Sequence, residues 1–395
     1  MSPSPHPGSR LNIVADAHIW EVEEAFSTLP GYDVSLNILE AADITRNALQ
    51  HADVLITRSS TQVNEALLAG TPVRFAATAT IGDDHYDKKW LREHGIHFAN
   101  AAGSSTGSVI EYMLTTLLEL HMRGLIALPD ITLGIIGAGR IGGRLADICD
   151  KLGIHTLLND PPRARSEGAK NFVELDELLA SADILSLHTP LKRSGKDQTW
   201  HLLNAERLAR FQGHGIINTS RGSCLDNTAL PDWLDGNKSR FAAIDCWENE
   251  PAISSTLLAH PRLAIATPHI AGHSLDGKAA NTLFARQALC RWLGVDTQWR
   301  MEGLLPETAQ PINIPCTPDV WGNLHAAATA MYSIANDDAA LRSIDLVPAK
   351  DIARKFASFR RHYPMRRSWS QIPLHFLHPD PLTLKMARAM GIKVI

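Results

Sequence analysis

Short apolar segments alternate with amphipathic segments along most of the chain. In the N-terminal part, residues 11–15, 53–57 and 73–78 predict strands, and residues 17–28 predict a helix. This alternation is typical of α/β proteins, in which helices cover the faces of a parallel sheet. The N-terminal part is therefore expected to be an α/β unit.

A longer run of the same alternation occupies residues 125–270 and follows a helical pattern at 109–123. The strands expected here are 131–137, 154–159, 184–188, 215–219, 241–245 and 263–267. Helical patterns separate several of them, at 140–152, 174–182 and 227–234. Successive βα units of this kind predict a doubly wound parallel sheet.

The pattern changes near residue 295. Residues 297–321 are irregular and contain Pro306, Pro311, Pro315 and Pro318, so a linker or domain crossing is expected. Residues 322–395 are expected to form a small α+β unit that ends in a helix and a short strand at 381–395.

Composition narrows the classes of function. The length of 395 residues suggests two or three domains, and a net charge of −4 gives no basic excess for binding nucleic acid or a membrane surface. No apolar run reaches the ~18–20 residues needed to span a bilayer, and Met1–Arg10 lacks the apolar core of a signal peptide. The five cysteines are widely spaced, which argues against disulfides and a cysteine zinc site. We therefore expect a cytoplasmic protein without a metal, nucleic-acid or membrane partner.

The strongest local motif is GAGRIG at 137–142, which directly follows an expected strand and opens an expected helix. That context is the one in which GxGxxG predicts a dinucleotide site. Gly137 is expected to make the tight turn, Gly139 to admit the pyrophosphate, and Gly142 to let the helix pack on the strand. Arg140 and Ile141 lie between them, at the helix N-terminus that offers free N–H groups to phosphates.

Asp160 follows the next expected strand, about 18 residues beyond Gly142. A carboxylate there accepts hydrogen bonds from ribose hydroxyls and repels a 2′-phosphate, which favours NAD over NADP. Arg163 and Arg165 follow closely and weaken that preference. The alternative interpretation is that the glycines form only a tight strand–helix turn.

Three short polar segments come at the ends of successive expected strands, where doubly wound folds bind ligands. They are NTSRG at 218–222, DCWENEP at 245–251 and TPHIAG at 267–272. His269 has the side chain type that takes a proton near neutral pH, and Glu250 is placed to orient its ring. Arg221 is suited to clamp a substrate carboxylate through its planar fork. Each residue alone is also compatible with a structural role; their joint placement favours catalysis.

These motifs, together with HTPL at 188–191, resemble the D-isomer-specific 2-hydroxyacid dehydrogenases, and the resemblance covers about residues 11–395. It implies NAD as cofactor and Arg221, Glu250 and His269 as the catalytic residues. It also implies cofactor contacts from Asp160, Thr189, Thr219, Ser220, Arg221, Asp245 and Gly272.

Further segments resemble a narrower branch of the family, whose members oxidise 4-phospho-D-erythronate in pyridoxal 5′-phosphate synthesis. They are TRSSTQVNEALL at 57–68, TATIGDDH at 78–85, DPPRAR at 160–165, HIAGHSLDGKA at 269–279 and DDAALR at 337–342. A basic C-terminal patch of Arg360, Arg361, Arg366 and Arg367 adds to this resemblance.

The narrower resemblance implies that Ser59 and Thr80 contact the substrate. Arg58 is a candidate for its phosphate, with an ordinary surface charge as the alternative. Arg366 and Arg367 are candidates for reaching a phosphate across a dimer interface, although a solvated basic face is the favoured interpretation. His273 stands where these proteins usually have a substrate-contacting Tyr, and Ser104-Ser105 replaces a Cys-Asn pair.

The family topology implies a flavodoxin-like, discontinuous substrate domain of 11–107 and 270–295. It implies a Rossmann NAD-binding domain of 108–269 and a dimerisation domain of 296–395, with the active site in a cleft that closes around the substrate. Two alternatives stay open. One is another D-2-hydroxyacid dehydrogenase, such as one acting on 3-phosphoglycerate, and the other is a non-enzymatic dimer that senses NAD(H).

Overall fold

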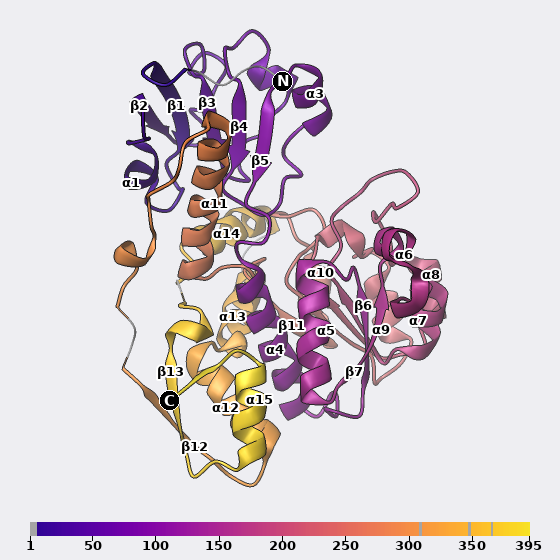
Figure 1. Cartoon of the computed structure of the whole chain (residues 1–395). Helices are drawn as coiled ribbons and strands as arrows, with labels where there is room; N and C mark the ends of the chain where they lie inside the picture. The colour runs from indigo at the N-terminus through magenta and orange to yellow at the C-terminus, as the bar shows by residue number, and fades with distance from the viewer. Residues whose placement is uncertain (1–5, 308–309, 347–348, 365) are drawn as a thin grey trace. The chain divides into compact units, whose positions relative to one another are not determined.

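A computed structural model describes residues 6–307, 310–346, 349–364 and 366–395 (Figure 1). The chain divides into two compact units. The first unit holds residues up to 105 together with 274–307, and the second holds 106–273 and the remaining C-terminal residues. None of the helices in the described ranges is long and apolar enough to cross a membrane. A separate domain at 296–395 stays a prediction.

The first unit is built on five parallel strands in the order β2-β1-β3-β4-β5. The strands are β1 (Arg10–Asp16), β2 (Asp33–Leu39), β3 (Val54–Thr57), β4 (Phe75–Thr78) and β5 (His97–Asn100). This strand order is that of flavodoxin-like folds, as the family resemblance implies.

Helices cover both faces of this sheet (Figure 1). On one face, α1 (Val22–Phe26) and α11 (Leu275–Leu293) pack their apolar side chains against β1, β3 and β4. On the other face lie α2 (Glu65–Leu68) and α3 (Lys88–Glu93). All four side chains of β3 and of β4 are buried, as expected for strands covered on both sides.

The sequence prediction was wrong at two places in this unit. The helix expected at 17–28 is only α1, because the Asp16 carboxylate accepts a hydrogen bond from the His18 amide at 2.8 Å and holds the preceding residues in a turn. Strands β2 and β5 were not predicted. Both lie at an edge of the sheet and bury their side chains only in part, so their apolar pattern is weak.

The second unit contains six parallel strands in the order β11-β10-β9-β8-β6-β7, which confirms the predicted doubly wound sheet. They are β6 (Thr132–Ile136), β7 (His155–Asn159), β8 (Ile184–Leu187), β9 (Gly215–Asn218), β10 (Phe241–Ile244) and β11 (Leu263–Ala266). The order reverses between β6 and β8, and such a switch point is where these folds bind ligands.

The helices of this sheet are α4 (Thr106–Met122), α5 (Arg140–Leu152), α6 (Pro161–Glu167), α7 (Leu175–Ser181), α8 (Ala205–Arg210), α9 (Leu230–Asp235) and α10 (Ser255–Leu258). Side chains of α4 and α5 share one core with β6 and β10, and those of α7 to α10 share another on the opposite face. Short 3₁₀ turns lie at Ala169–Asn171, Gly222–Cys224, Glu302–Leu304, Ser343–Leu346 and Trp369–Gln371.

The C-terminal residues add a three-stranded parallel sheet, β12 (Ile312–Pro315), β13 (Pro373–Leu377) and β14 (Lys393–Val394). Its helices are α12 (Val320–Met331), α13 (Ile334–Arg342), α14 (Ala349–Arg361) and α15 (Pro381–Ala389). Leu324 of α12 and Trp369 join the core built around α4. Strand β12 corrects the expectation that 297–321 is irregular: it is an edge strand, where flanking prolines are tolerated.

Candidate active site

The glycine loop has the geometry that the motif predicts. Gly137 has φ +91°, and a Cβ there would lie 2.8 Å from the carbonyl oxygen of His188. A Cβ on Gly142 would lie 2.1 Å from the Gly137 carbonyl oxygen, so only glycine permits this approach of α5 to the turn. A Cβ on Gly139 would meet nothing within 4 Å. The space beside Gly139 is therefore open, and Arg140 next to it is exposed, whereas Ile141 is partly buried against the core.

Asp160 is attached to this loop. Its Oδ2 accepts a hydrogen bond from the Ala138 amide at 3.0 Å, and its Oδ1 caps α6 through the Arg163 amide at 3.1 Å. The guanidinium of Arg163 pairs with Glu167 at 2.7 Å and that of Arg165 with Asp197 at 2.6 Å. Both arginines thus have carboxylate partners, which makes them weaker candidates for binding the 2′-phosphate of NADP.

His188 and Thr189 follow β8 beside the glycine loop. His188 Nε2 lies 2.8 Å from the Ser186 hydroxyl, and its Nδ1 lies 3.4 Å from that of Thr219. Burial lowers the pKa of His188 to about 4, so the ring is neutral at pH 7. A methyl carbon of Thr189 would lie 3.0 Å from a Cβ on Gly137.

The turn after β9 is fixed by Asn218. Its side-chain oxygen accepts hydrogen bonds from the amide and hydroxyl of Ser220, and its side-chain nitrogen donates to the carbonyls of Arg221 and Cys246. A Cβ on Gly222 would lie 1.8 Å from the Trp247 carbonyl oxygen. The backbone that carries Arg221 therefore packs directly on the segment that leads to Glu250.

Asp245 organises the segment after β11. Its side chain is only 1% exposed and accepts hydrogen bonds from the Thr267 hydroxyl at 2.8 Å and the amides of Ile270 and Ala271 at 2.7 and 3.1 Å. Its backbone carbonyl accepts from the His269 amide at 2.8 Å. Burial raises the pKa of Asp245, against the opposing effects of the His269 charge and these hydrogen bonds.

Glu250 and His269 form a close pair. Glu250 Oε2 lies 2.7 Å from His269 Nδ1, and Glu250 Oε1 accepts from the Trp247 amide at 2.7 Å. Burial alone would raise the pKa of Glu250, but the charge and hydrogen bond of His269, with the charge of Arg360 and the Trp247 amide, bring it below the ordinary value. His269 has φ +56°, which is uncommon for a residue with a side chain and marks local backbone strain.

His273 and Gly272 end this segment. The His273 amide donates to the Ile270 carbonyl at 2.8 Å, and its ring lies 5.9 Å from that of Tyr363. These contacts do not test the expected roles of the two residues. Gly272 as a cofactor contact and His273 as a substrate contact therefore stay predictions.

The remaining predicted substrate residues belong to the first unit. Ser59 follows β3 and Thr80 follows β4, so both lie near the carboxyl ends of neighbouring strands. The Thr80 hydroxyl lies 2.6 Å from that of Thr78, and an Arg58 N–H donates to the His18 carbonyl at 2.9 Å. Nearby, the Ser104 hydroxyl donates to the Ala101 carbonyl at 2.7 Å and also contacts Asn281.

The interpretation of Arg366 as part of a solvated basic face was wrong. Its side chain is 7% exposed and pairs with Glu111 of α4 at 3.0 Å. It also donates to the carbonyls of Ser108 and Ala271 and lies over the ring of Tyr332. Arg366 thus ties the C-terminal residues to the segment that carries His269, a contact the sequence could not indicate because its partners lie far away along the chain.

The described residues fit a dinucleotide. The open space at Gly139 and the free amides at the start of α5 are suited to a pyrophosphate, and the strand order places this turn at the switch point of the sheet. The three catalytic candidates follow β9, β10 and β11, at the same edge of the sheet.

Comparison with known proteins agrees with this geometry. Residues 119–271 match the model of the D-isomer specific 2-hydroxyacid dehydrogenase, NAD binding domain. The chain is 41% identical to an erythronate-4-phosphate dehydrogenase of Pseudomonas aeruginosa over 362 residues, which is 90% of this chain and 93% of the relative. It is 39% identical to one of Hydrogenovibrio crunogenus, over 98% of this chain and 99% of the relative. The chain belongs to the D-isomer specific 2-hydroxyacid dehydrogenase family.

Solved structures related to the family show the same fold. A D-lactate dehydrogenase from Aquifex aeolicus, complexed with NAD and lactic acid, has a TM-score of 0.60 and 23% identity, over 71% of this chain and 95% of that one. An NAD⁺-bound 3-phosphoglycerate dehydrogenase in Entamoeba histolytica has a TM-score of 0.59 and 21% identity, over 72% of this chain and 95% of that one. At these identities the likeness extends to the fold alone.

Proposed function

We propose that the protein oxidises the 2-hydroxyl group of 4-phospho-D-erythronate to the 2-oxo acid, with NAD as the hydride acceptor, in the synthesis of pyridoxal 5′-phosphate. The observation that carries the chemistry is the pair of Glu250 and His269, joined at 2.7 Å. The substrate is supported by the near full-length similarity to proteins named erythronate-4-phosphate dehydrogenase.

NAD, when bound, supplies the nicotinamide ring that accepts a hydride. His269 takes the proton of the substrate hydroxyl at Nε2, because Nδ1 is engaged with Glu250. The Glu250 carboxylate fixes the ring and stabilises the imidazolium that results. Arg221 holds the substrate carboxylate and polarises the carbonyl that forms.

The glycine loop is proposed to hold the pyrophosphate of NAD and Asp160 to accept from a ribose hydroxyl. The full set of proposed cofactor contacts is Gly137, Gly139, Arg140, Ile141, Gly142, Asp160, Thr189, Thr219, Ser220, Arg221, Asp245 and Gly272. Because Asp245 already accepts three hydrogen bonds from the protein, it also acts by holding the segment of His269 in place.

Ser59, Thr80 and His273 are proposed to contact the substrate, and Arg58 its phosphate. Arginine suits a phosphate because its parallel N–H groups bind two oxygens at once. Residues 296–395 are proposed to pair two copies of the chain into a homodimer.

The test is turnover with NAD of 4-phospho-D-erythronate, 3-phosphoglycerate and unphosphorylated erythronate, following both NADH and the oxo acid. We expect oxidation of 4-phospho-D-erythronate alone. Preference for 3-phosphoglycerate would mean that the proposed substrate is wrong, while the proposed hydride transfer to NAD would stand. Binding of NAD without turnover of any of the three would favour the sensing alternative.

A further inference from the structure

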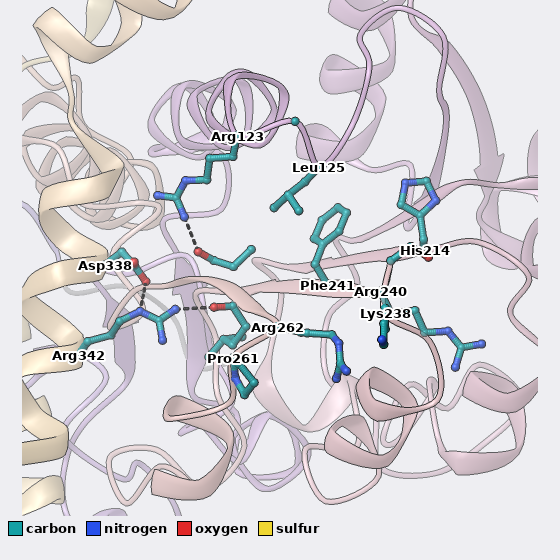
Figure 2. Close-up of a pocket in the computed structure, with 14 residues that line it drawn as sticks. Arg123, Leu125, His214, Lys238, Arg240, Phe241, Pro261, Arg262, Asp338 and Arg342 are labelled. Carbon is teal, nitrogen blue, oxygen red and sulfur yellow. Dashed lines mark hydrogen bonds and ion pairs between the residues drawn. The ribbon is translucent and has the colours of Figure 1, made fainter.

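A cavity of about 590 Å³ opens in the second unit (Figure 2). Its lining includes His214, Arg240 and Arg262, which directly precede β9, β10 and β11. The catalytic candidates follow the carboxyl ends of the same three strands. Because the strands are parallel, the cavity lies at the opposite edge of the sheet, about 13 Å or one strand length away.

The lining carries an excess of positive charge. It contains Arg123, Lys238, Arg240, Arg262 and Arg342, against the single carboxylate of Asp338. Carboxylates pair with three of the arginines: Glu119 with Arg123, Asp235 with Arg262, and Asp338 with Arg342. Among the residues that the structure describes, no carboxylate pairs with Lys238 or Arg240. The cavity is therefore suited to a ligand with negative charge.

Neutral groups add to these carboxylates in holding the arginines in place. Arg123 donates to the Ala264 carbonyl at 2.6 Å, and Arg342 donates to the Leu263 carbonyl at 2.5 Å (Figure 2). Arg342 also donates to the Leu258 carbonyl at 2.9 Å. Arg240 lies over the Trp233 ring at 4.8 Å. Arg123 and Arg342 also pair with carboxylates, whereas Arg240 is held by the ring and the carbonyl of Trp233, which do not cancel its charge. A ligand that binds here would lose little affinity to the ordering of side chains.

One side of the cavity is apolar. Leu125 and Pro261 contribute side chains that are at least partly exposed, whereas Phe241 is only 1% exposed and lies edge-on to the His214 ring at 5.9 Å. The volume falls within the roughly 300–1,000 Å³ that small-molecule sites enclose. A bare inorganic ion would leave this apolar side exposed to water, so an organic group attached to the anion fits better.

We propose that this cavity binds a small phosphorylated organic anion at a site separate from the catalytic residues. Lys238 and Arg240 supply the uncompensated charge, and Leu125 and Pro261 contact the organic group. The proposal does not depend on which hydroxy acid the protein oxidises.

The probes are phenyl phosphate and inorganic phosphate, titrated calorimetrically into the full-length protein saturated with NAD. We expect saturable binding of phenyl phosphate, at least about fivefold tighter than inorganic phosphate because its ring covers the apolar side. Lys238→Glu should weaken phenyl phosphate binding about tenfold, since it reverses a charge in the cavity. Lys151→Glu is the matched control, an exposed lysine in the last turn of α5 that does not line the cavity.

Three outcomes would overturn the proposal. Absence of binding by both probes would show that the cavity is no anion site. Equal affinities for the two probes would exclude a role for the apolar side. Lys238→Glu and Lys151→Glu could weaken phenyl phosphate binding equally, or Lys238→Glu could leave it unchanged. Either result would mean that the phosphate binds outside this cavity, for example in the catalytic site.

Discussion

Oε2 of Glu250 lies 2.7 Å from Nδ1 of His269, although the two residues follow different strands. Two contacts hold their segments together: the Trp247 indole donates to the Thr267 carbonyl, and the His269 amide donates to the Asp245 carbonyl, both at 2.8 Å. These contacts between the two segments set the pair. Because Nδ1 of His269 is engaged with Glu250, Nε2 is the nitrogen that we propose takes a proton from the substrate.

Glu250→Gln is expected to lower kcat about 10–100-fold, because the imidazolium loses its carboxylate partner. Steady-state kcat values of the variant and the wild type test this. Glu248→Gln is the control, because Glu248 pairs with His201 instead, at 2.6 Å, and should leave kcat nearly unchanged. Equal kcat values for Glu250→Gln and wild type would contradict the role of Glu250.

Gly222→Ala should abolish most activity, because a Cβ at this position would lie 1.8 Å from the Trp247 carbonyl oxygen. Moving either backbone changes the position of Arg221 relative to Glu250 and His269, and a shift of about 1 Å costs on the order of 100-fold in rate. Gly107→Ala is the matched control, since a Cβ there meets nothing within 4 Å. Steady-state rates of the two variants, each checked for folding by circular dichroism, should differ by that factor; equal rates would refute the close packing.

Arg366→Met should destabilise the second unit by about 3–5 kcal/mol, because it leaves the buried Glu111 carboxylate without its cation. Adding Glu111→Gln should restore part of the loss. Arg361→Met, an exposed neighbour in the same basic patch, should change stability by no more than about 0.5 kcal/mol. Thermal unfolding of the three variants measures this. Equal effects of Arg366→Met and Arg361→Met would mean that Arg366 is a surface charge after all.

His188 should make stability depend on pH. Its folded pKa of about 4 lies below the unfolded value near 6.5, so the unfolded chain binds more protons between these values. Its contribution is therefore complete above about pH 6.5 and is lost as the pH falls toward 4. Between pH 7 and pH 5 the wild type should lose on the order of 1–2 kcal/mol more than His188→Gln, measured by unfolding of the apo protein. The same loss in both would show that His188 is not held neutral.

The sequence predicted the parts of the fold that depend on short-range pattern. Strands such as β3 and β8 are continuous apolar runs because both faces of their sheets are covered. The positions of Arg221, Glu250 and His269 after successive strands placed all three at a common edge of the sheet, where Glu250 and His269 form a pair. The edge strands β2 and β5 escaped prediction, since their half-exposed positions carry a weaker signal.

Contacts between segments that lie far apart along the chain could not be predicted from the sequence. Glu111 and Arg366 each look like surface charges, and only the fold brings α4 and the C-terminal residues together. The same holds for Arg360 of α14, whose charge lowers the pKa of Glu250. The basic cavity likewise arises from residues that precede three different strands.

The most direct measurement compares His269→Ala with wild type, using turnover of 4-phospho-D-erythronate and the affinity for NADH by fluorescence. Loss of a positioned general base should lower kcat by about 100- to 10,000-fold, while NADH affinity stays within about twofold. Retention of most of the turnover, or an equal loss of NADH binding, would contradict the assignment of His269 as the base of an NAD-dependent oxidation.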